Sequence, residues 1–242
     1  MILTDIMKLE TFESKVSGET LKYTVYIPEE KKDKYKLFIF MHGAGERGDD
    51  GLKPIVYHAK IAKMIIEHPE YGKDTIIIAP QVPTDQRWVP LQDIFDGTYK
   101  YKTNPLQPIT YTFNDFLENE LFKRYPIDKN YIYMGGISMG GTGIMDYITR
   151  YPNMFAAVIP ICGTADMDSV EIYKKTPMWM FHSSDDTTVN YVPFKNVAAK
   201  LKEIGAEINY TEYNDTGHPS WHRAYETEGL LDWLYSHKNN KL

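Results

Sequence analysis

Short apolar runs, separated by segments of helical periodicity, constrain the fold of this chain more than any other feature. The runs without polar alternation fall at residues 37–41, 75–79, 131–134, 156–161 and 178–181. Continuous apolar runs of this length are typical of strands that are buried on both faces of a parallel sheet. Further strands are predicted at residues 9–13, 22–27 and 208–213.

Helices are predicted between these strands, where apolar residues recur on one face. The segments are residues 60–67, 114–124, 141–150, 192–204 and 225–234. Alternating strands and helices predict an α/β fold with a mostly parallel sheet of about eight strands and helices on both faces. A length of 242 residues suits a single domain over residues 1–242. Ligands of such sheets bind beyond the carboxyl ends of the strands.

One segment, residues 81–108, interrupts the alternation. It contains several prolines and the aromatic residues Trp88, Phe95, Tyr99 and Tyr101, without a clear period. Long irregular insertions are either functional lids or covering loops, and both interpretations stay open. Because the segment leaves a strand on the ligand side of the sheet, we place it near the active site.

A candidate nucleophile lies where the strand at 131–134 passes into the helix at 141–150. Residues 136–140 read G-I-S-M-G, which matches the nucleophile elbow of α/β-hydrolases. The glycines leave room for a tight turn, which strains the serine backbone and exposes its hydroxyl. Ser138 would also stand at the positive end of a helix dipole. The alternative is a glycine-rich turn with a hydroxyl cap.

A second glycine turn supplies a candidate oxyanion hole. The strand at 37–41 ends in His42, followed by Gly-Ala-Gly. In α/β-hydrolases such a turn aims one backbone N–H at the developing oxyanion, and the residue after the nucleophile supplies the other. We assign these donors to Ala44 and Met139. His42 with Glu46 or Asp49 lacks the spacing of a metal site, and we predict no metal and no cofactor.

The acid and the base are expected on later strand-to-helix loops, in the order serine, acid, histidine. Asp186 follows the strand at 178–181 and is our candidate acid, with Asp185 as the second choice. Alternatively, both carboxylates assist the start of the helix at 192–204. His218 lies in the loop after the last strand and is the candidate base.

Charge and composition exclude several other classes of protein. The net charge is −6 and no block of Lys or Arg occurs, so we expect neither nucleic acid nor a membrane as partner. A single cysteine, Cys162, precludes an internal disulfide, and the first residues do not resemble a signal peptide. We expect a cytoplasmic protein or the mature domain of a secreted one. Oligomeric state is left open.

Several segments together resemble the prolyl-oligopeptidase-like esterase group of α/β-hydrolases, whose members include predicted peptidases, phospholipase/carboxylesterases and feruloyl-esterase-like proteins. The segments are F-M-H-G-A-G-E-R-G-D at 40–49, A-P-Q at 79–81, G-I-S-M-G-G at 136–141, F-H at 181–182 with Asp186, and G-H-x-x-W at 217–221. The resemblance covers about residues 23–234. It implies a cofactor-free hydrolase in which Ser138, Asp186 and His218 form the triad.

We therefore predict a serine carboxylic-ester hydrolase that forms a covalent acyl-enzyme. The expected substrates are small-molecule or carbohydrate-linked esters with small or aromatic acyl groups; the resemblance suggests feruloyl, cinnamoyl or acetyl esters of plant polysaccharide. A serine peptidase, a lysophospholipase or an inactive binding module of the same fold are the alternatives. Trp88, Trp221 and Gln81 are the candidate substrate-binding residues. We expect the tryptophans to favour aryl-acyl over long aliphatic esters, unless they only pack the loops.

Overall fold

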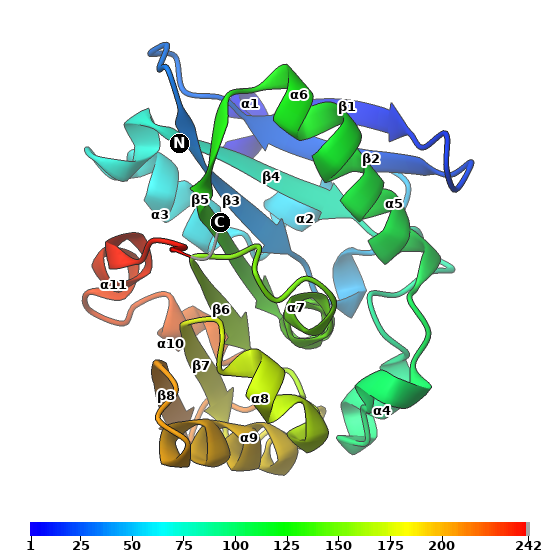
Figure 1. The fold of residues 1–242 in the computed structure, drawn as a ribbon, viewed down its shortest axis with the longest axis vertical. Coiled ribbons are helices and arrows are strands. Elements are labelled where there is room, and N and C mark those ends of the chain that lie inside the picture. The colour runs from blue at the N-terminus through cyan, green and yellow to red at the C-terminus, as the bar shows by residue number, and fades with distance from the viewer. Residues whose placement is uncertain (241–242) are drawn as a thin grey trace.

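The computed structural model describes residues 1–240 and contains one eight-stranded sheet in the order β1-β2-β4-β3-β5-β6-β7-β8 (Figure 1). The first two pairings, β1 with β2 and β2 with β4, are antiparallel, and the remaining pairings are parallel. The strands are β1 (Lys8–Glu13), β2 (Thr20–Tyr26), β3 (Tyr35–Met41), β4 (Thr75–Gln81), β5 (Ile127–Ile137), β6 (Ala157–Ile161), β7 (Met178–Ser183) and β8 (Ile208–Tyr213). The prediction of a mostly parallel sheet of about eight strands is confirmed.

Helices cover both faces of the sheet. The α-helices are α1 (Leu3–Ile6), α2 (Lys53–Val56), α3 (Lys60–Glu67), α4 (Leu91–Asp96), α5 (Pro108–Phe116), α6 (Phe122–Arg124), α7 (Met139–Arg150), α8 (Val170–Tyr173), α9 (Val192–Glu203), α10 (Trp221–Ala224) and α11 (Leu230–Ser236). In Figure 1, α5, α7, α8 and α9 lie in front of the sheet. Residues of α3, α10 and α11 belong to the apolar cluster on the opposite face.

Two predicted helices have different bounds in the structure. The helix expected from residue 114 begins at Pro108, which suits the first helical position because proline has no N–H to satisfy there. It continues through a π-helical turn, η4 (Leu117–Leu121), into α6. The helix expected at 225–234 begins only at Leu230, because Gly229 adopts a left-handed conformation with φ of 73°.

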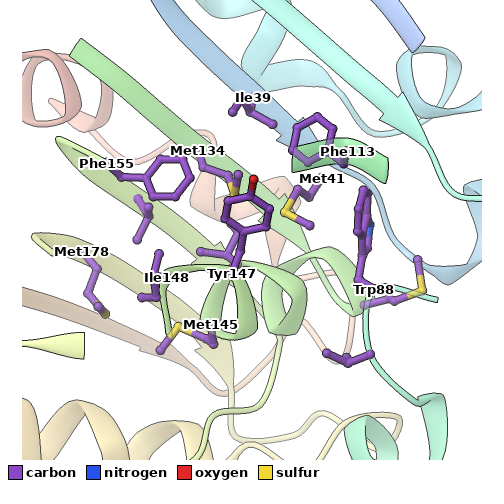
Figure 2. Packing of buried hydrophobic residues seen from close by; sticks show 14 of the residues in the cluster. Ile39, Met41, Trp88, Phe113, Met134, Met145, Tyr147, Ile148, Phe155 and Met178 are labelled. Atoms are coloured by element: carbon purple, nitrogen blue, oxygen red, sulfur yellow. The ribbon is translucent and has the colours of Figure 1, made fainter. Parts of the chain in front are cut away.

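The apolar core has two layers, one on each side of the sheet. The layer beneath α5, α7 and α9 contains Met41, Trp88, Phe113 and Tyr147, which Figure 2 shows packed around α7. Burial on both faces explains why the central strands have continuous apolar sequences. The parallel strands β3, β5, β6 and β7 end at the same edge of the sheet, and this edge carries the candidate site.

No helix within residues 1–240 is both long and apolar enough to cross a lipid bilayer.

Candidate active site

Ser138 occupies a strained turn between β5 and α7. Its backbone has φ of 52° and ψ of −116°, outside the regions that non-glycine residues ordinarily adopt. The turn is possible because its flanking residues lack side chains. A methyl group at Gly136 would lie 2.7 Å from the carbonyl oxygen of Met41, and one at Gly140 would lie 2.1 Å from the same oxygen. Close packing of α7 against the end of β3 therefore requires glycine on both sides of Ser138.

The structure brings Ser138, His218 and Asp186 together, although they are far apart in the sequence. His218 Nε2 lies 2.9 Å from Ser138 Oγ, and His218 Nδ1 lies 2.7 Å from Asp186 Oδ2. Both distances are those of good hydrogen bonds. Ser138 is 7% exposed, so its hydroxyl sits at the floor of the site rather than on an open surface.

Asp186 is held as a carboxylate by four hydrogen bonds. Its Oδ1 accepts from the backbone N–H groups of Thr188 (2.8 Å) and Val189 (2.9 Å). Its Oδ2 accepts from the rings of His218 and of His182, which lies 3.0 Å away. Burial alone would raise the pKa of Asp186, but the hydrogen bonds from His182, His218 and Val189 outweigh it and hold that pKa well below its usual range.

The ionised Asp186 fixes the tautomer of His218. A carboxylate can only accept, so the Nδ1 atom of His218 carries the hydrogen. Nε2 is then left with a lone pair that accepts the hydroxyl hydrogen of Ser138. This is the arrangement in which an imidazole can remove a proton from serine as the hydroxyl attacks.

The neighbouring Asp185 has a different position. Its Oδ1 accepts from the backbone N–H of Gly217 at 2.9 Å and from the hydroxyl of Ser183. It therefore ties the loop after β7 to the loop that carries His218. Neither carboxylate is given a hydrogen bond to the first N–H groups of α9, and the side chain of Asn190 accepts from the N–H of Val192 at 3.1 Å.

The turn after β3 passes directly beside Ser138. A methyl group at Gly43 would lie 3.6 Å from Ser138 Cβ. Ala44 is the first residue of the short 3-10 helix η1 (Ala44–Glu46), and Met139 is the first residue of α7. The N–H groups of first helical residues have no partner within their own helix, so both can bind a ligand atom.

His42 braces this turn, a role that the sequence did not reveal. Its Nδ1 donates to the carbonyl of Gly43 at 2.6 Å, and its Nε2 accepts from the N–H of Val82 at 2.9 Å. Burial lowers the pKa of His42 to about 4, so the ring is neutral at physiological pH. The histidine thereby links the turn to the start of segment 81–108. This role follows from its two backbone partners in the fold.

Other side chains hold the rest of the loop. Arg47 donates to the carbonyl of Ala44 at 2.8 Å, and the buried carboxyl of Glu46 lies 3.3 Å from Nε2 of His58. Burial raises the pKa of Glu46. Gln81 donates to the carbonyl of Glu46 at 2.9 Å and accepts from the N–H of Gly51 at 2.5 Å. The amide of Gln81 is thus fully engaged in the loop.

The two tryptophans lie in different surroundings. Trp88 is 1% exposed and packs in the core against Phe113 and Met41 (Figure 2), so its ring does not face solvent in this structure. Trp221 is 8% exposed, and its ring meets the ring of His218 edge to face, with centroids 5.6 Å apart. Of the two, only Trp221 contacts a residue of the candidate triad.

Segment 81–108 is anchored to the body of the protein. The Tyr99 hydroxyl donates to the buried carboxylate of Asp146 at 2.6 Å, and Arg150 binds the same carboxylate at 2.7 Å. Lys100 pairs with Asp166 at 2.9 Å. Through these contacts and the buried ring of Trp88, the segment packs onto α7 and covers it.

Within residues 1–240, no group of three or more His, Cys, Asp or Glu side chains is arranged to hold a metal ion.

Comparisons with known proteins identify a family and structures with the same fold. The sequence model of the phospholipase/carboxylesterase family matches residues 23–234. Acyl-protein thioesterase 1 of Neurospora crassa is 26% identical in an alignment 223 residues long, with coverage of 81% of this chain and 84% of that protein.

Solved structures share the fold. A thermostable esterase is 32% identical, with a TM-score of 0.83 over 97% of this chain; the chain spans only 64% of that esterase's length. A ferulic acid esterase superposes with a TM-score of 0.67 at 19% identity, covering 95% of this chain and 98% of that chain. At this lower identity the likeness concerns the fold alone.

Proposed function

The chain belongs to the phospholipase/carboxylesterase family of α/β-hydrolases, and we propose that it is a serine carboxylic-ester hydrolase that works through an acyl-enzyme on Ser138. The observation that carries this proposal is the chain of two hydrogen bonds, 2.9 Å from Ser138 to His218 and 2.7 Å from His218 to Asp186. It couples a strained, glycine-flanked serine to a base of defined tautomer.

In the proposed acylation step, Ser138 Oγ attacks the ester carbonyl while His218 Nε2 takes the hydroxyl proton. The tetrahedral intermediate carries a negative oxygen, which the N–H groups of Ala44 and Met139 stabilise. Collapse of the intermediate breaks the bond to the alcohol, and His218 returns its proton to the departing oxygen. Asp186 stabilises the imidazolium while it exists.

Deacylation repeats these roles with water as the nucleophile. His218 removes a proton from water, which attacks the carbonyl carbon of the acyl-enzyme. The same N–H groups stabilise the second intermediate. Its collapse breaks the bond to Ser138 Oγ and releases the carboxylic acid, while His218 returns its proton to Ser138 Oγ and restores the hydroxyl.

For the substrate, we propose a small-molecule or carbohydrate-linked ester with a small or aromatic acyl group. The support for an aromatic group is Trp221, whose ring lies against the ring of His218, the proposed base. Because Trp88 is buried in the core, Trp221 is the tryptophan that this proposal relies on. A panel of acetyl, feruloyl, long-chain acyl, thioester and peptidyl substrates separates this class from lysophospholipase, thioesterase and peptidase activity.

The nucleophile is tested by Ser138→Ala with Ser236→Ala as a matched control on the surface of α11. We expect Ser138→Ala to lower kcat/KM for p-nitrophenyl acetate by about 10⁴, with an unchanged circular dichroism spectrum. Ser236→Ala should behave as wild type. A Ser138→Ala protein that keeps its activity would overturn the proposal, and a wild type inactive on the whole panel would favour a binding module.

A further inference from the structure

We propose that His182 is a positioning residue that holds Asp186 and moderates the charge on its Oδ2, the oxygen that also accepts from His218. This inference depends on the catalytic roles proposed above, because it concerns how the acid acts on the base. It starts from the observation that Asp186 Oδ2 accepts from two imidazole rings, His218 at 2.7 Å and His182 at 3.0 Å.

The ring of His182 is enclosed by the strand end and by neighbouring aromatic side chains. The residue lies near the end of β7 and is fully buried. Rings from the start of α9 enclose it, with centroids of Phe194 at 5.6 Å and of Tyr191 at 6.2 Å. Asp186 follows in the turn directly after the strand, so a rigid strand end fixes the distance between the two side chains.

The hydrogen on His182 is assigned by its partner. Asp186 is ionised and accepts only, so His182 must carry its hydrogen on Nε2. Its Nδ1 atom is buried and finds no partner within residues 1–240. A buried nitrogen without a partner costs free energy that an apolar side chain in the same space would avoid. The polar contribution of this ring is therefore its bond to Asp186.

The shared oxygen has a consequence for catalysis. Two donors on Oδ2 divide its negative charge, so each imidazole experiences a weaker acceptor than it would alone. A weaker acceptor stabilises the imidazolium form of His218 less. Loss of the His182 donor should therefore strengthen the bond between Asp186 and the imidazolium form of His218, and the pH profile of a His182 variant tests this.

Other titratable groups lie on the elements packed around this pair and stay the same in the experiment below. They are Asp185 in the same turn, Cys162 just after β6, Tyr191 and Lys195 at the start of α9, Glu212 of β8, and His218 itself. Lys195 lies 3.1 Å from Glu212, so these two charges offset one another.

The test compares His182→Met with His182→Gln. Methionine and glutamine have similar length and volume, but only glutamine has an amide N–H that can replace the donor. We measure kcat/KM for p-nitrophenyl acetate from about pH 5 to pH 9, where the acid limb reports protonation of the free enzyme's base. For His182→Met we expect the midpoint of that limb to rise by about half to one pH unit and the plateau to fall by about tenfold.

For His182→Gln we expect a midpoint within about 0.2 pH units of wild type and a plateau within about threefold. A purely structural role would lower the plateau without moving the midpoint. Unmoved midpoints in both variants, or a fall in His182→Met, would overturn the inference.

A measurement on the wild type covers the case in which a variant does not fold. In ¹⁵N-histidine NMR spectra, His182 should be the Nε2–H tautomer, and the Nδ1–H tautomer would overturn the inference. Ser138→Ala, assayed alongside, distinguishes failure of the proposed function from failure of the role of His182. If that variant stays active, the proposed function fails; if it is inactive while the His182 variants show no shift, only the role of His182 fails.

Discussion

Replacing His42 by glutamine should change how the stability of the protein depends on pH. His42 is fully buried, with Nδ1 donating to Gly43 and Nε2 accepting from the N–H of Val82. Protonation of Nε2 would break the second bond and leave a buried charge. Burial accordingly lowers the pKa of His42 from 6.5 to about 4.

The direction of the effect follows from proton uptake. The unfolded chain binds a proton at this histidine below pH 6.5, whereas the folded chain binds it only near pH 4. The contribution of neutral His42 to the free energy of unfolding is therefore complete above pH 6.5 and is lost as the pH falls toward 4. Since one pKa unit corresponds to 1.36 kcal/mol, the loss reaches about 2 kcal/mol at pH 5 and about 3 kcal/mol at pH 4.

Urea unfolding at about pH 7.5 and about pH 5 measures this loss. We expect His42→Gln to destabilise the protein more at the higher pH, by about 2 kcal/mol relative to the lower pH, because glutamine does not titrate. If His42→Gln lowered the free energy of unfolding equally at the two pH values, the assignment of His42 as a neutral, buried, hydrogen-bonded side chain would be refuted.

Four further predictions concern the site and the segment packed beside it. Asp186→Asn should lower kcat by about 10⁴, because the tautomer of His218 is lost, whereas Asp185→Asn should cost less than about tenfold; the reverse ranking in steady-state kinetics would exchange their roles. Trp88→Ala should lower the free energy of unfolding by about 3–5 kcal/mol. Trp221→Ala should reduce turnover of methyl ferulate more than that of p-nitrophenyl acetate, and equal losses would make Trp221 a scaffold residue. Hydrolysis should persist in EDTA, since Ser138, His218 and Asp186 supply the nucleophile, base and acid; loss restored by zinc or calcium would contradict this.

The sequence predicts a structural element correctly where a steric rule or a hydrophobic period determines it. The buried strands have uninterrupted apolar runs because both faces are covered, and the turn at Ser138 needs glycines because α7 packs on β3. The order of the three loops placed Ser138, Asp186 and His218 at one edge of the sheet before any contact was known.

Features that depend on side-chain direction could not be derived in this way. Segment 81–108 has no hydrophobic periodicity that would show which of its aromatic side chains face the core. The burial of Trp88 is therefore seen only in its contacts with the core. His42 and His182 both lie at the end of a strand. The role of His42 comes from the backbone N–H of Val82, which is distant in the sequence, and the role of His182 from the carboxylate of Asp186 across a turn. The break at Gly229 likewise depends on a left-handed backbone, which glycine permits but does not require.

The central claim is that Ser138 is the covalent nucleophile, and mapping the adduct of a fluorophosphonate probe tests it most directly. Labelled wild-type protein is digested and the modified peptide identified by mass spectrometry. We predict one adduct, on Ser138, formed by wild type and lost in Ser138→Ala, and slowed in His218→Ala because the base is missing. An adduct on another residue, or labelling of Ser138→Ala at the wild-type rate, would contradict the account.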